Sequence, residues 1–152
     1  LKVGVHPAEI QFQAGGYVDA NGNGIGDFGF LSEMAGGPVE ASTLTLNLLP
    51  ETWNAVEPVI NGYHYAVWLP DGNGGASGTP AERAAAKGPA EMHFVAYAWP
   101  SSREAGRRMF AITASGVVRA TEWDGAAPEW FALWGEAVND WVTAPAWPPY
   151  RR

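Results

Sequence analysis

The fold is decided by the stretch MHFVAYAW at residues 92–99, which Pro100 follows. Aromatic and β-branched residues dominate this stretch, and they fit the pleated, half-buried surface of a strand. Similar stretches are YHYAVWL at 63–69, RMFAIT at 108–113 and VVRAT at 117–121. The last two flank Ala114-Ser115-Gly116, which predicts a tight hairpin. We therefore expect an antiparallel sheet of about four strands over residues 60–121.

The segment upstream of this sheet predicts little regular structure beyond a short helix. In PAEIQFQA at residues 7–14, Pro7 suits a first helical turn and Gly15-Gly16 can end it. Residues 1–16 are thus predicted to hold a short N-terminal helix, and residues 17–36 an acidic loop followed by one helical turn. TLTLNL at 43–48 alternates polar and apolar residues, which indicates either a strand or an extended loop.

The tail, residues 122–152, is rich in tryptophan. Between residues 128 and 141 its apolar residues recur at the spacing of one helix face, which predicts a C-terminal helix. These residues are Trp130, Leu133, Trp134, Ala137, Val138 and Trp141. Tryptophans in this pattern either fill a core or form a platform that stacks on sugars, and the core is favoured.

The composition fits a single α+β domain over residues 1–152. Charged residues make up only 16%, and 19 glycines and 12 prolines argue against a helical bundle. A net charge of −7 leaves no basic face for phosphates, which argues against nucleic acid or an anionic membrane surface as a partner. The absence of cysteine excludes disulfides, thiolate nucleophiles and cysteine zinc sites.

A candidate calcium site lies in YVDANGNGIGD at residues 17–27. Oxygen-bearing side chains alternate there, as a hard cation with several oxygen ligands requires, and Gly24 permits a sharp turn. The predicted Ca²⁺ ligands are Asp19, Asn21, Asn23, Ile25 through its carbonyl, Asp27, and Glu33. So few carboxylates predict weak affinity, suited to extracellular calcium. The alternative is an Asn-Gly turn that binds nothing.

No catalytic arrangement stands out in the sequence, so we expect a protein that is not an enzyme. The serines lie outside a nucleophile elbow. The glycine-rich stretches lack the Lys-Ser/Thr of a phosphate-binding loop. A hydrolase that uses His64 or His93 with nearby acids is the least favoured alternative.

Several stretches together resemble type IV pilin-like proteins. AEIQFQAGGY at 8–17 resembles the end of their long N-terminal helix. The acidic loop at 19–27 and FGFLSEMAG at 28–36 are similar to the phrase that follows this helix in bacterial pseudopilins. The predicted strands are also similar, so the resemblance covers most of residues 8–121.

The resemblance implies a pilin-like head in a type IV pilus-like or type II secretion pseudopilus-like filament. Such a subunit associates with copies of itself or with other pilin-like subunits. It is exported to the periplasm or cell surface, and a hydrophobic N-terminal helix anchors it in the inner membrane before assembly. That helix would require about 20 apolar residues upstream of Leu1, and it would be the chain's only membrane contact.

The alternative function is a secreted carbohydrate-binding or adhesive module. It would expose a flat face made by several tail tryptophans, of which the candidates are Trp123, Trp130, Trp134 and Trp141.

Overall fold

The computed structural model describes residues 4–19, 23–39, 45–72, 74–82 and 89–151. Its α-helices are α1 (Val5–Gly15) and α2 (Leu31–Met34). Its strands are β1 (Val59–Ile60), β2 (Tyr63–Pro70), β3 (Ala76–Ser77), β4 (Val95–Pro100), β5 (Arg108–Thr113) and β6 (Arg119–Glu122). Short 3-10 turns cover Glu51–Trp53, Pro80–Glu82, Pro89–Glu91 and Ala132–Trp134. The α+β class is therefore confirmed.

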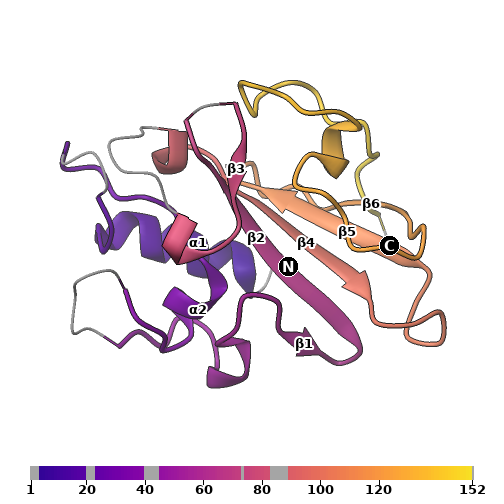
Figure 1. Cartoon of the computed structure of the whole chain (residues 1–152), viewed down its shortest axis with the longest axis horizontal. Helices are drawn as coiled ribbons and strands as arrows, with labels where there is room; N and C mark the ends of the chain where they lie inside the picture. Colours follow the sequence, from indigo (N-terminus) through magenta and orange to yellow (C-terminus); the bar gives the residue numbers. More distant parts are fainter. Residues whose placement is uncertain (1–3, 20–22, 40–44, 73, 83–88, 152) are drawn as a thin grey trace.

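All the strands join one antiparallel sheet in the order β1-β2-β4-β5-β6 (Figure 1). The four predicted strands are its main members, and the predicted hairpin joins β5 to β6 with Phe110 opposite Ala120. The expected number of strands was too low, because the two-residue strands β1 and β3 pair with opposite ends of β2. Strands this short carry almost no periodic signal for a sequence to reveal.

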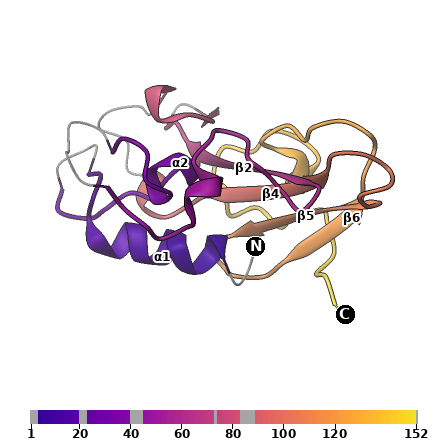
Figure 2. The same cartoon turned by 90° about the horizontal axis from the view of Figure 1, so that it is seen from below.

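The sheet is covered on both faces, and β4 is consequently buried at every position. On one face, Ala96 joins a core made with α1 and α2. On the other, Val95, Tyr97 and Trp99 join a core made with the C-terminal tail. Figure 2 shows α1 and most of the tail on opposite sides of the sheet. The sequence of β4 is therefore a continuous apolar run, because the side chains on both faces of this strand are buried.

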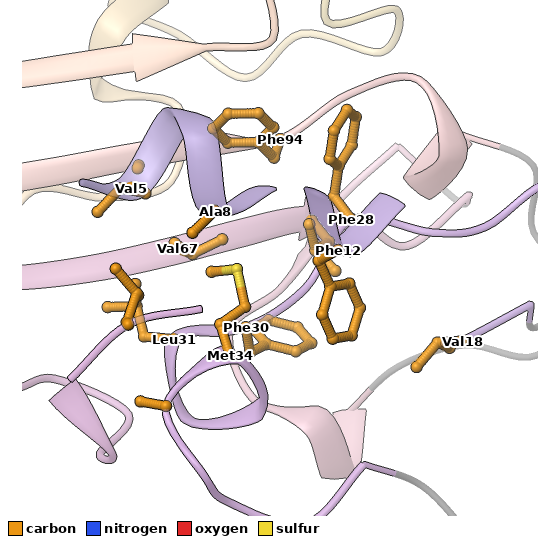
Figure 3. Packing of buried hydrophobic residues seen from close by; sticks show 14 of the residues in the cluster. Val5, Ala8, Phe12, Val18, Phe28, Phe30, Leu31, Met34, Val67 and Phe94 are labelled. Carbon is orange, nitrogen blue, oxygen red and sulfur yellow. The ribbon is translucent and has the colours of Figure 1, made fainter. Parts of the chain in front are cut away.

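Helix α1 is longer than the one or two turns expected, with 11 residues from Val5 to Gly15. Pro7 lies within the first turn, where a missing N–H costs no intrahelical bond. Val5, Ala8 and Phe12 share its buried face and meet the aromatic residues that follow the acidic loop (Figure 3). The helix ends at Gly16, whose φ of 65° is a left-handed value.

The predicted C-terminal helix is wrong. Within 128–141 the only helical segment is the 3-10 turn Ala132–Trp134, which Gly135 ends with a φ of 80°. An irregular chain laid over the sheet buries Leu133, Trp134, Val138 and Trp141 instead. Apolar spacing alone does not fix a helix, because a flat sheet face accepts the same side chains from an irregular chain.

The 43–48 stretch forms no strand in its described part, residues 45–48. Residues 43 and 44 lie outside the described residues. The extended-loop interpretation therefore applies to the part that the structure shows.

Candidate functional site

The acidic loop connects α1 to α2, and Asp19 organises its turn. One carboxylate oxygen of Asp19 accepts the Gly24 N–H at 2.7 Å and the other accepts the Asn23 N–H at 3.2 Å. The Oδ1 atom of Asn23 accepts the Ile25 N–H at 2.9 Å. Gly24 has a φ of 85°, a conformation that glycine adopts without steric cost. The Asp and Asn side chains thus close the turn that the Asn-Gly pattern indicates.

A residue far along the chain reaches this turn. Asn23 donates from Nδ2 to Oε1 of Glu91 at 2.6 Å, across 68 positions of sequence. Glu91 ends the 3-10 turn that precedes β4. It therefore brings a second carboxylate to the loop, in contact with the Asn23 side chain. No local pattern could have revealed Glu91, because only the fold brings it near the loop.

Two other predicted ligands, Asp27 and Glu33, lie in the interior with no exposed surface. Glu33 Oε1 accepts the Phe30 N–H at 2.8 Å at the start of α2. The backbone N–H of Asp27 donates to the Val18 carbonyl at 2.7 Å. The carboxylates of Asp27 and Glu33 are thus buried, whereas Asp19 and Asn23 lie at the surface turn.

A third buried carboxylate, Glu9 of α1, was not among the predicted ligands. Its Oε1 accepts the Gly29 N–H at 2.7 Å, one residue before the amide that Glu33 binds. Glu9 lies on the buried face of α1, with Ala8 and Phe12. Its position among these apolar residues is the one feature of the sequence that could have predicted its burial. Glu9 and Glu33 together bind consecutive amides and so fix the segment between the loop and α2.

The predicted Ca²⁺ ligands that the structure describes are therefore divided between the surface turn and the interior. Asn21 lies outside the described residues, and the Ile25 side chain is 49% exposed beside the turn. Within the described residues, no group of three or more His, Asp or Glu is arranged to hold a metal ion. Among the described residues, Asp19, Asn23 and Glu91 bring side-chain oxygens to the surface turn. A carboxylate oxygen has more than one lone pair, so one hydrogen bond does not prevent it from binding a cation.

The tail tryptophans do not form an exposed platform. Trp134 and Trp141 are 6% and 8% exposed, and both belong to the core beneath the tail. Trp130 stacks on Trp141 at 5.2 Å and 9°. The guanidinium of Arg103 lies over the half-buried Trp123 ring at 5.0 Å. The core interpretation is confirmed for Trp134 and Trp141.

His64 and His93 are not brought together. His64 lies opposite Trp99 in the β2–β4 register, stacks on it at 5.4 Å, and has its Nδ1 3.1 Å from Oε2 of Glu57. His93 precedes β4, at the other end of the same strand pair. Burial lowers the pKa of His93, and the nearby charge of Asp140 partly opposes this.

Comparisons of the chain with protein-family models, with curated proteins and with solved structures found no match. No helix among the described residues is both long enough and apolar enough to cross a membrane.

Proposed function

We propose that this protein is a non-enzymatic structural subunit of a type IV pilus-like or type II secretion pseudopilus-like filament, exported to the periplasm or cell surface. The observation that carries the proposal is the order of parts. Helix α1 is followed by the acidic loop, by the short helix α2 and the 3-10 turn Glu51–Trp53, and then by the antiparallel sheet that begins at Val59. Helix α1 packs on one face of that sheet. A filament subunit needs such a rigid head joined to an N-terminal helix.

The outer surface of α1 supports self-association. Its exposed residues are Pro7, Ile10, Gln11, Ala14 and Gly15, and none of them is charged. Glu9, the one charged residue of α1, points inward and is fully buried. An uncharged helix face can pack against the same face of another subunit without the cost of burying unpaired charges.

The gene that encodes the chain tests this proposal. A filament subunit should carry about 20 apolar residues upstream of Leu1, long enough to anchor it in the inner membrane. A plain cleavable secretion signal directly before Leu1 would contradict the proposal.

We further propose that calcium stabilises the loop at the surface turn of Asp19 and Asn23, with Glu91 as an added ligand. A cation there would neutralise the carboxylates of Asp19 and Glu91, which bind the backbone N–H and the side-chain amide of Asn23 respectively. It would also order glycine-rich backbone, which is entropically costly to fix. Asp27 and Glu33 would then support the loop from within, through the buried segment that leads to α2.

Thermal unfolding with millimolar calcium and with excess chelator tests the calcium proposal. At a calcium concentration about tenfold above Kd, binding adds about 1.4 kcal/mol of stability, or roughly 3–5 °C in Tm. Asp19→Ala should abolish this calcium-dependent shift. Asp71→Ala is the matched control, because Asp71 also closes a glycine-rich turn by accepting the Gly75 N–H at 3.1 Å. A shift that is absent, or that survives Asp19→Ala, would overturn the proposal.

A further inference from the structure

Two hollows lie side by side at one end of the sheet, and His93 and Trp141 line both of them. The first, of about 220 Å³, lies between the end of β2 and tail residues Asn139 and Asp140. The second, of about 340 Å³, lies between the end of β5 and the next stretch of the tail. The two hollows thus follow one another along the line where the tail crosses the sheet.

The backbone between the hollows is strained at a bulky residue. Trp141 has a φ of 59°, a left-handed value that an aromatic side chain rarely adopts. Asp140 holds this bend, because its Oδ1 accepts the Val142 N–H at 3.2 Å and the Thr143 N–H at 3.1 Å. Strained residues of this kind concentrate at binding sites, where the surrounding structure imposes them.

Apolar side chains stand at the rims of both hollows. Met92 borders the first and is 66% exposed, and Val142 borders the second and is 70% exposed. They are the two most exposed large hydrophobic residues in the described part of the chain. Their exposure is unfavourable in the free protein, and a ligand with an apolar face would cover it.

The polar groups differ between the hollows. The first offers the amide of Asn139 and the carboxylate of Asp140. The second offers the hydroxyls of Thr113 and Ser115 and the guanidinium of Arg119. Arg119 is fixed in place because its Nη1 donates to the Trp147 carbonyl at 2.9 Å. A guanidinium has five N–H groups, so this contact leaves donors for an anion.

We propose that these hollows are consecutive subsites for an acidic glycan, with a neutral sugar against Asn139 and Asp140 and a uronate facing Arg119. A sugar ring presents an apolar face together with hydroxyls, which matches apolar rims combined with a few directed polar groups. The carboxylate of a uronate would form a charge-assisted hydrogen bond with Arg119. Asp140 would repel a uronate from the first subsite, which sets the order of the two sugars. This inference does not depend on the filament proposal.

Calorimetric titration with two tetrasaccharides tests the site. The acidic probe alternates glucuronate with N-acetylglucosamine, and the neutral probe is the chitin tetrasaccharide. The wild-type protein should bind the acidic probe about tenfold more tightly than the neutral one. The reason is that the hydrogen bond between Arg119 and the uronate carboxylate, which the neutral probe lacks, raises the affinity by about this factor. Binding should also shift the imidazole NMR signals of His93, which lies between the subsites.

Arg119→Gln should remove the preference for the acidic probe, because it removes the positive charge from the second hollow. Arg107→Gln is the matched control, since Arg107 is an exposed arginine that lines neither hollow. If Arg119→Gln does not fold, Asn139→Ala replaces it and should weaken both probes. For the wild type, the proposal is overturned if neither probe binds or if the His93 signals do not move. For the variants, it is overturned if Arg107→Gln loses as much affinity for the acidic probe as Arg119→Gln. It is also overturned if the replacement Asn139→Ala leaves both affinities unchanged.

Discussion

The hydroxyl of Tyr97 joins the sheet to the tail at a point with no solvent access. It donates to the Trp130 carbonyl at 2.6 Å and accepts the Leu133 N–H at 3.0 Å. The ring is fully buried and meets Trp147 edge-on at 5.8 Å. A single side chain of the sheet therefore satisfies two backbone groups of the irregular tail.

Tyr97→Phe should destabilise the protein by about 1–3 kcal/mol, because it leaves these two backbone groups without a partner inside the protein. Urea unfolding measures this loss. Tyr63→Phe is the control, since the Tyr63 hydroxyl makes one longer contact, 3.3 Å to the Arg108 carbonyl, near solvent. That change should cost less than about 0.5 kcal/mol. Equal losses in the two variants would mean that the Tyr97 hydroxyl does not anchor the tail.

Stability should also fall in alkaline solution. Burial raises the pKa of Tyr97 well above its ordinary value of 10.0. The stabilising effect of the neutral phenol is thus fully present below pH 10.0, the unfolded value, and is lost as the pH rises toward the folded one. Unfolding free energies measured between about pH 9 and pH 11 should decline, and Tyr97→Phe should flatten this decline. If the unfolding free energy of the wild type does not change over this pH range, the result would contradict a stabilising role for the neutral Tyr97 phenol.

At the residue scale the sequence indicated the turn but not its partners. Asp19 and the Asn-Gly pattern predicted a loop closed by side-chain oxygens, because these contacts are local. Glu91 could not be predicted, since its contact with Asn23 depends on the whole sheet being formed. The burial of Asp27 and Glu33 was also missed, because spacing alone does not say whether a carboxylate faces water or backbone amides.

At the scale of elements, the main strands were predictable and the tail was not. Aromatic and β-branched runs that end at Pro70 and Pro100 mark β2 and β4 directly, because proline interrupts a ladder. The tail has apolar residues at helical spacing, yet Gly135 and Trp141 adopt left-handed conformations that interrupt any helix. Packing against the second sheet face overrode the periodic pattern.

Gly135→Ala distinguishes the helix that the sequence predicts for the tail from the irregular chain that the structure shows. In a helix, this change would stabilise the protein by about 1 kcal/mol. At the observed φ of 80° it should instead destabilise by about 1–2 kcal/mol, because an L-residue is strained there. Gly4→Ala is the control, since Gly4 has a φ of −101° and open space around an added Cβ. Thermal unfolding measures both variants. A higher Tm for Gly135→Ala would contradict the left-handed conformation and would favour a helix in the tail.

At the scale of the whole molecule, one sheet separates two different coverings. Helices α1 and α2, with the aromatic segment just before α2, cover one face, and most of the tryptophan-rich tail covers the other. The filament proposal concerns the first covering, where α1 presents an uncharged outer surface. The glycan proposal concerns the end of the second, around His93 and Trp141. The two proposals therefore stand on separate surfaces and can succeed or fail independently.

Immunogold electron microscopy of the producing cells, with antibodies raised against this chain, tests the filament proposal most directly. We expect gold particles along filaments that begin at the cell envelope, and recovery of the chain in the fraction released by shearing. Label that is dispersed through the cytoplasm, with none on filaments and none in the sheared fraction, would contradict the proposed function.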